Sequence, residues 1–187
     1  MNIPIISGSR NPEGQTARAA KALMQGVIEI GGSSEVVFLP QESIERCRQC
    51  DDNGWGLCIR EGKCVIDDDL STLVDRMKAA DAVVFATPVY FSDLSESLKA
   101  LLDRVRRTCR HEASKDGIAG KPAVGICVAG GGGGGAPACC VILEKVLATC
   151  GFDVVDMVPA RRQNLDHKLG VLKATGAWLA KVVTSNE

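Results

Sequence analysis

The order of apolar and polar stretches constrains the fold more than any other feature of this chain. Short, continuous apolar runs, typical of strands buried on both faces, alternate with longer segments whose apolar residues recur at helical spacing. We expect the strands at residues 3–7, 35–39, 82–86, 123–128 and 152–158. Strand–helix alternation of this kind predicts a parallel sheet with helices packed on both faces.

The expected helices are recognised by their ends. The first covers Thr16 to Ile30 and stops at a glycine pair. Another begins behind the acidic run 67–69, which complements a helix dipole. Ser92 or Asp93 is expected to cap the helix that follows the third strand.

The length of the chain selects among sheets of this type. Five strand–helix units within 187 residues favour a flavodoxin-like three-layer α/β sandwich with strand order 2-1-3-4-5, rather than a longer dinucleotide-binding fold or a barrel. No internal repeat or linker interrupts the pattern. We therefore expect a single domain, residues 1–187, with a cysteine-rich loop at about residues 41–66.

Composition excludes several classes of partner. The formal net charge is −1, so no overall field attracts nucleic acid or an anionic membrane. No stretch reaches the roughly 18 apolar residues that span a bilayer. Residues 1–9 lack the basic start and long apolar core of a signal peptide. We expect a cytoplasmic protein without nucleic-acid or membrane partners.

Ligands of such sheets bind beyond the carboxyl ends of the strands, where the strand order switches. The first loop there, residues 7–16, is rich in small and hydroxyl residues and precedes a helix N-terminus, an arrangement that suits a phosphate monoester. Arg10 adds a bidentate contact. An ordinary turn is the alternative, and no Gly-Lys-Ser/Thr follows, which excludes a triphosphate-binding loop.

Two more loops are expected at the same edge. Residues 87–92 are apolar and aromatic and include Tyr90, a composition that suits contact with the edge of a flat heteroaromatic ring. A rigid loop packed on the core would have the same composition and is the alternative. The glycine run Gly130–Gly135 allows close approach of backbone to a ligand. It matches Gly-x-Gly-x-x-Gly only trivially, and in the fourth unit instead of the first, so a dinucleotide fingerprint is not indicated.

Four motifs together resemble those of the NAD(P)H-dependent FMN reductase family of flavodoxin-like proteins. They are Ser7-Gly-Ser9-Arg10 with Gly14-x-Thr16, then Ala80-Asp81, Thr87-Pro88-Val89-Tyr90 and Leu98-Lys99-Ala-Leu-Leu-Asp103-Arg104. The similarity covers most of the chain, and the motifs fall in the right order on the expected elements.

The resemblance implies a complete FMN site, with Ser7 in its first motif. It implies that Ser9, Arg10, Gln15 and Thr16 hold the phosphate, that Pro88, Val89, Tyr90 and Phe91 contact the ring, and that Gly130, Gly131 and Gly132 close its other edge. It also implies NAD(P)H as co-substrate and a homodimer or homotetramer. The flavin carries the chemistry, so no catalytic side chain is expected. Lys99, Asp103 and Arg104 are expected to be structural or intersubunit.

Nine cysteines are many for a cytoplasmic chain, and their odd number without a secretion signal argues against a disulfide framework. Cys109, Cys127, Cys139, Cys140 and Cys150 are interpreted as small buried hydrophobes. The other four crowd into the pattern Cys47-x2-Cys50-x7-Cys58-x5-Cys64.

This pattern resembles the compact cysteine motif of iron-sulfur flavoproteins, a branch of the same superfamily. That branch usually has two residues between its second and third cysteines, whereas seven intervene here. Thiolates this closely spaced can hold a [4Fe–4S] cluster or a tetrahedral zinc ion. Free thiols, or a redox-active pair formed by Cys47 and Cys50, remain as the alternatives without metal.

These observations predict an FMN-dependent NAD(P)H oxidoreductase that passes electrons to a flavin, a quinone or a similar small-molecule or protein acceptor. A cluster, if present, would relay single electrons. The alternative is a non-enzymatic electron carrier. Carriers of this type tend to be strongly acidic and to place the ring between aromatic residues. A nearly neutral chain with glycines in the third loop favours hydride transfer instead.

Overall fold

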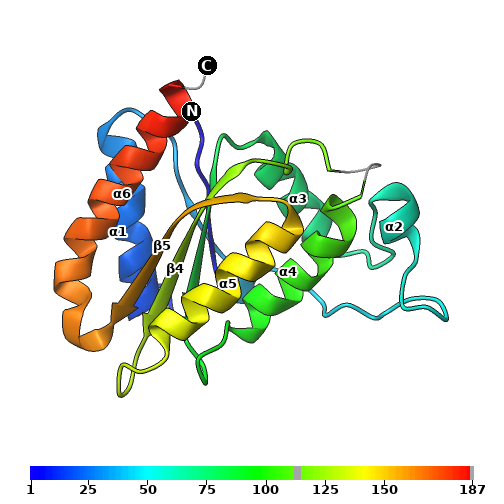
Figure 1. Cartoon of the computed structure of the whole chain (residues 1–187), viewed down its shortest axis with the longest axis horizontal. Helices are drawn as coiled ribbons and strands as arrows, with labels where there is room; N and C mark the ends of the chain where they lie inside the picture. Colours follow the sequence, from blue (N-terminus) through cyan, green and yellow to red (C-terminus); the bar gives the residue numbers. More distant parts are fainter. Residues whose placement is uncertain (112–114, 186–187) are drawn as a thin grey trace.

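The computed structural model describes residues 1–111 and 115–185. Five parallel strands form one sheet in the order β2-β1-β3-β4-β5, as predicted (Figure 1). The strands are β1 (Ile5–Ser7), β2 (Val36–Phe38), β3 (Val83–Pro88), β4 (Pro122–Ala129) and β5 (Asp153–Arg161).

The strand order reverses between β1 and β3, which lie side by side. Ser7, the last residue of β1, pairs with Ala86 of β3, and Pro88, the last residue of β3, pairs with Val128 near the end of β4. The carboxyl ends of these three strands therefore open at one edge of the sheet. This is the switch point at which such sheets bind ligands.

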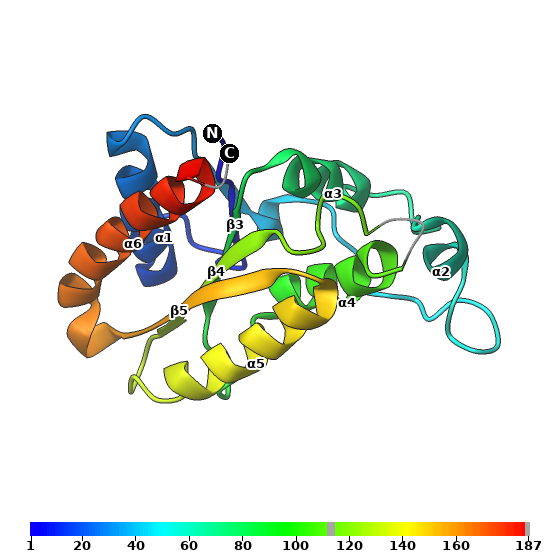
Figure 2. The same cartoon turned by 45° about the horizontal axis from the view of Figure 1, so that its top comes forward.

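Helices cover both faces of the sheet and complete three layers (Figures 1 and 2). On one face lie α1 (Gln15–Glu29) and α6 (Leu165–Ser185), and on the other lie α3 (Leu70–Ala79), α4 (Glu96–Cys109) and α5 (Ala136–Cys150). Leu23 and Leu172 belong to the first apolar core, and Phe85, Leu101 and Leu143 to the second.

Helices α1 and α6 pack so closely that their backbones meet. A Cβ atom at Gly26 would overlap the carbonyl oxygen of Lys173, and one at Gly176 would overlap the carbonyl oxygen of Leu23. Backbone atoms cannot rotate out of the way as a side chain can, so both positions require glycine. This contact holds α6 against α1, whose N-terminus lies at the ligand-binding edge.

The prediction that Ser92 or Asp93 caps helix α4 is wrong. Neither Ser92 nor Asp93 caps α4, because Ser92 lies in a tight turn and Asp93 closes that turn. The cap is Ser95, whose Oγ accepts a hydrogen bond of 3.4 Å from the backbone N–H of Leu98. The third strand also runs two residues further than expected, to Pro88.

Two short 3-10 turns, η1 (Leu39–Gln41) and η2 (Arg162–Asn164), follow β2 and β5. After η1 the cysteine-rich segment runs beyond the end of the sheet. It contains one short helix, α2 (Leu57–Glu61), which lies beside α4 at the right of Figure 1. No helix among the described residues is long and apolar enough to cross a membrane.

Candidate functional site

The three loops expected to bind a ligand meet around one cavity of about 500 Å³ at the switch point. It lies between the end of β1 with the start of α1, the end of β3, and the loop from β4 to α5. Its lining residues are Ser9, Gln15, Thr16, Pro88, Val89, Tyr90, Val128, Ala129 and Gly130 to Gly134.

The end of the cavity at α1 is built to receive an anion. Thr16 lies in the first turn of α1 and is buried. No side chain of residues 1–111 or 115–185 caps this helix, and its first turn contains no acidic residue. Ser9 is also buried, and its backbone N–H donates to Ser7 Oγ over 3.2 Å. The free N–H groups of an uncapped helix N-terminus favour a phosphate group.

Gln15 supplies an independent sign of a missing ligand. Its Oε1 atom is buried and accepts no hydrogen bond from the described residues. An unpaired buried acceptor costs about 1–3 kcal/mol, so such groups rarely persist without a partner. A ligand hydroxyl in the cavity would provide the absent donor.

The glycine loop forms the opposite wall. Added Cβ atoms at Gly130, Gly131 or Gly132 would meet no atom within 4 Å, so packing does not explain these glycines. A bare backbone that faces the cavity does, because it lets a flat ligand approach closely. The side chain of Gln163 in η2 supports the loop by donating to the carbonyl of Gly132 over 3.1 Å.

Nine of the twelve residues expected to bind FMN line this cavity, and three do not. Ser7 is fully buried at the end of β1 and supports Ser9. Arg10 is exposed. Phe91 lies at the tip of a turn, also outside the lining. Val128 and Ala129 were missed, although their place at the end of β4 could have indicated them. Gly133 and Gly134 also line the cavity and belong to the predicted glycine run, but only its first three residues were expected to contact FMN.

The turn that carries Phe91 is strained. Tyr90 and Asp93 exchange backbone hydrogen bonds of 3.1 and 2.9 Å, and the two residues between them, Phe91 and Ser92, have φ angles of 50° and 65°. Turns with two positive φ angles prefer Asn and Gly. Phe91 nevertheless occupies the first position with its side chain fully exposed, next to the mouth of the cavity. Strain of this kind is concentrated at functional sites.

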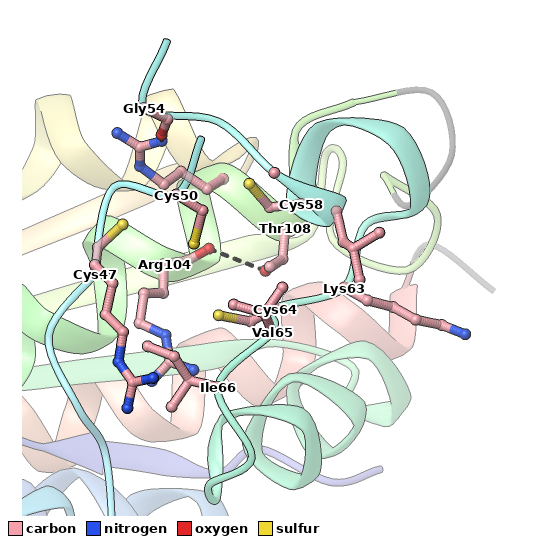
Figure 3. A pocket seen from close by; sticks show the side chains of 14 residues that line it. Cys47, Cys50, Gly54, Cys58, Lys63, Cys64, Val65, Ile66, Arg104 and Thr108 are labelled. Atoms are coloured by element: carbon pink, nitrogen blue, oxygen red, sulfur yellow. Dashed lines mark hydrogen bonds between the residues drawn. The ribbon is translucent and has the colours of Figure 1, made fainter. Parts of the chain in front are cut away.

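A second, small pocket is lined by all four clustered cysteines (Figure 3). Cys47 and Cys50 come from the extended segment, Cys58 from α2 and Cys64 from the segment that returns to α3. All four are partly buried and unpaired. The rest of the lining includes Arg48, Lys63, Ile66, Arg104, Arg107 and Thr108.

A buried ion pair attaches this segment to α4. Arg104 and Asp68 are 1% and 2% exposed, and two hydrogen bonds of 2.5 and 2.9 Å join them. The Nη1 atom of Arg104 also donates to the carbonyl of Glu45 over 3.0 Å. Asp68 in turn accepts from the backbone N–H of Glu45 over 2.9 Å. The pair therefore closes a polar network that ties the cysteine segment to the domain.

Both charges are stabilised by this arrangement. Burial opposes ionisation of Asp68, but hydrogen bonds from Arg104 and from the N–H groups of Glu45 and Leu70 outweigh it and keep the pKa of Asp68 below its usual value. Burial likewise opposes the charge of Arg104, yet interactions with Asp68 and Cys64 keep its pKa above the usual value.

Trp55 closes the outer side of the cysteine segment. The guanidinium of Arg107 lies 4.5 Å from the centre of the Trp55 ring, within the range of a cation–π contact. Arg107 also donates to the carbonyl of Gly54 over 2.7 Å. The seven-residue insert between Cys50 and Cys58 thus forms a surface turn held against α4.

The four sulfur atoms surround a space instead of converging on a point. Among residues 1–111 and 115–185, no three Cys, His, Asp or Glu side chains are grouped closely enough to hold a single metal ion. This geometry does not favour the tetrahedral zinc alternative. The four thiols nevertheless line one cavity, and Arg48, Arg104 and Arg107 line it with them.

The other five cysteines are buried, as expected. Burial raises the pKa of the Cys150 thiol to about 12 and also raises that of Cys109. Such thiols stay protonated at neutral pH and are poor nucleophiles.

One family of known proteins matches most of this chain. The family model for NADPH-dependent FMN reductase matches residues 1–164. The chain is 34% identical over 125 residues to an iron-sulfur flavoprotein of Methanocaldococcus jannaschii, covering 67% of this chain and 62% of that protein. It is 35% identical over 104 residues to an iron-sulfur flavoprotein of Methanosarcina thermophila, covering 56% and 52%. The matched part spans half to three fifths of these curated relatives.

Solved structures share the fold at lower identity. An NAD(P)H:quinone oxidoreductase from Methanothermobacter marburgensis superposes with a TM-score of 0.68 at 22% identity, covering 95% of this chain and 94% of that one. An archaeal flavodoxin superposes with a TM-score of 0.64 at 14% identity, covering 98% and 99%. At these identities the likeness establishes a flavodoxin-like fold. Because the family match extends over most of the chain, this protein belongs to the NADPH-dependent FMN reductase family.

Proposed function

We propose that the chain is an FMN-dependent oxidoreductase that takes electrons from NAD(P)H and passes them to a flavin, a quinone or a similar acceptor. The observation that carries the proposal is the switch-point cavity, in which an uncapped helix N-terminus, an unpaired Gln15 oxygen and a bare glycine wall face the same space. Each feature fits one part of FMN.

Different residues of the cavity would bind different parts of FMN. Ser9, Thr16 and the N–H groups of α1 would bind the phosphate, and Gln15 would accept from the ribityl chain. Pro88, Val89, Tyr90 and the glycine loop would enclose the ring. When bound, FMN supplies hydride acceptance and electron transfer. The chain itself would position the ring, and the proposal requires one face of it to stay open to a nicotinamide.

Multiple turnover separates this proposal from a simple electron carrier. We expect the FMN-loaded protein to oxidise NADPH or NADH repeatedly in the presence of added FMN or a quinone, measured anaerobically at 340 nm. A carrier would show one reduction of its bound flavin and almost no steady rate. A colourless protein that takes up no FMN would contradict both.

Replacing Thr16 with valine should weaken FMN binding by about ten- to a hundredfold. The substitution preserves the shape of this buried residue but removes a hydroxyl donor to a charged phosphate, and such hydrogen bonds contribute about 1.5–3 kcal/mol. Quenching of flavin fluorescence on titration measures the dissociation constant. Thr175→Val, a buried threonine on α6 away from the cavity, is the control. Equal affinities for the two variants would show that Thr16 does not contact FMN.

We further propose that Cys47, Cys50, Cys58 and Cys64 hold a [4Fe–4S] cluster. All four line one cavity, and their thiolates are the usual ligands of such clusters. The relatives named iron-sulfur flavoproteins support the assignment. The longer spacing between Cys50 and Cys58 does not conflict with it, because the insert forms a surface turn outside the cavity lining apart from Gly54, Gly56 and Leu57.

Replacing Cys58 with serine should abolish cluster binding and leave FMN binding intact, because the two cavities share no residue. The measurement is iron and acid-labile sulfide per chain after anaerobic purification, with about four of each expected in the unaltered protein. Cys150→Ser changes a fully buried thiol away from the cavity and should retain the iron. Iron retained in Cys58→Ser, or lost equally in both variants, would count against these ligands.

A further inference from the structure

One buried donor of the Arg104 side chain makes no hydrogen bond of ordinary geometry with the described residues, although the Cys64 thiol lies close enough to help raise the pKa of Arg104. Its Nη1 and Nη2 atoms are bonded to Asp68 and to the carbonyl of Glu45. Its Nε atom is fully buried and has no hydrogen-bond partner among the described residues. A buried N–H without an acceptor is rare in proteins and destabilises the fold that contains it.

This donor belongs to a residue that lines the cysteine cavity. Arg104 and Cys64 both contribute to the lining, and Figure 3 shows the Arg104 side chain beside the cysteines. Two hydrogen bonds to Asp68 and one to Glu45 hold the guanidinium in a single orientation. The guanidinium is therefore held rigidly, and its interaction with the Cys64 thiol places it beside a cysteine of the cavity lining.

The ion pair with Asp68 also determines how Arg104 can interact with a ligand in the cavity. Since Asp68 is equally buried and bonded to it bidentately, the pair carries almost no net charge. Arg104 would therefore act on a ligand in the cavity mainly as a directed N–H donor and only weakly as a positive charge. Hydrogen bonds to the sulfur atoms of iron–sulfur clusters stabilise the more negative, reduced state and raise the reduction potential.

We propose that Arg104 is a positioning and tuning residue for the cluster, which donates its Nε–H to a sulfur atom in the Cys47–Cys64 cavity and raises the potential at which the cluster accepts an electron. This inference rests on the proposed cluster. It goes further by assigning to a residue outside the cysteine motif a hydrogen bond that no cysteine spacing would indicate.

Pulsed EPR of the reduced cluster tests the hydrogen bond directly in the unaltered protein. The chain is produced with arginine labelled with ¹⁵N at Nε, loaded anaerobically with iron and sulfide, and reduced with dithionite. A ¹⁵N hyperfine coupling is expected. Arg48 and Arg107 also line the cavity, so the same spectrum is recorded for Arg48→Lys and Arg107→Lys, both of which should retain the coupling.

Arg104→Lys completes the test, because it keeps a cation next to Asp68 but removes the Nε–H. Loss of the coupling, with a shift of the EPR-monitored midpoint potential to a more negative value, is expected. Arg107→Lys should show a smaller shift. If Arg104→Lys does not fold, retention of the coupling in both of the other variants still assigns it to Arg104.

Failure of the Arg104 assignment and failure of the cluster proposal would give different results. A loaded wild-type protein without ¹⁵N coupling, or an Arg104→Lys variant that keeps the coupling and the wild-type potential, overturns the role of Arg104 and leaves the cluster standing. A wild-type chain that takes up no iron and sulfide overturns the cluster and, with it, this inference.

Discussion

Replacing Gly176 with alanine should lower the free energy of unfolding by about 3 kcal/mol. The added Cβ would overlap the backbone carbonyl of Leu23, so α6 must move away from α1 and disturb the core between them. Overpacking of a tight interior typically costs 1–3 kcal/mol, and backbone atoms offer less relief than side chains. Urea unfolding followed by circular dichroism measures the change.

Gly170 on the same helix provides a matched control of opposite sign. An added Cβ there would meet no atom within 4 Å. Because alanine favours the helical state over glycine, Gly170→Ala should stabilise the protein by about 0.5–1 kcal/mol. If the two substitutions have the same effect, the close backbone contact between α1 and α6 does not exist in solution.

Asp68→Ala should destabilise the protein by about 3–5 kcal/mol, because it leaves the buried guanidinium of Arg104 without its counter-charge. The loss should be measured as a drop in the urea midpoint at pH 7 together with faster proteolysis within residues 41–66. Glu45→Ala is the control. Among the described residues, its side chain pairs with the exposed Arg48, so its loss should leave the urea midpoint nearly unchanged.

The effect of Asp68 also has a defined pH dependence. Its pKa is lower in the folded protein than its ordinary value of about 3.9. The ion pair therefore contributes fully above that ordinary value and is lost as the pH falls through the lower, folded pKa. The stability difference between wild type and Asp68→Asn should accordingly be constant near neutrality and shrink in acid. A difference that grew on acidification would contradict the pair.

Local sequence patterns were sufficient for the strand order and for most of the flavin site. Buried parallel strands are continuous apolar runs, and the loops after the first, third and fourth of them had to meet at the switch point. Ser9, Thr16 and the glycines at 130–132 could therefore be predicted to line one cavity. Their roles toward FMN remain a proposal.

The errors arise where the structure depends on geometry that no pattern encodes. Ser92 was expected to cap α4, but with Phe91 it forms a turn whose positive φ angles sequence rules assign to Asn and Gly. That turn also keeps Phe91 out of the cavity. The pairing of Asp68 with Arg104 was not foreseen, because the two residues lie 36 positions apart and meet only when α4 packs beside the cysteine segment.

The surface turn between Cys50 and Cys58 has a consequence for recognising related proteins. Gly54, Gly56 and Leu57 line the cavity, and Arg107 of α4 holds Gly54 and Trp55 in place, but residues 51–53 lie outside the lining. The turn can therefore change in length at residues 51–53 without moving the cavity walls. A search pattern with fixed cysteine spacing would then overlook related chains with a longer turn. A better one would combine four cysteines of variable spacing with an aspartate just before α3 and an arginine in the second half of α4.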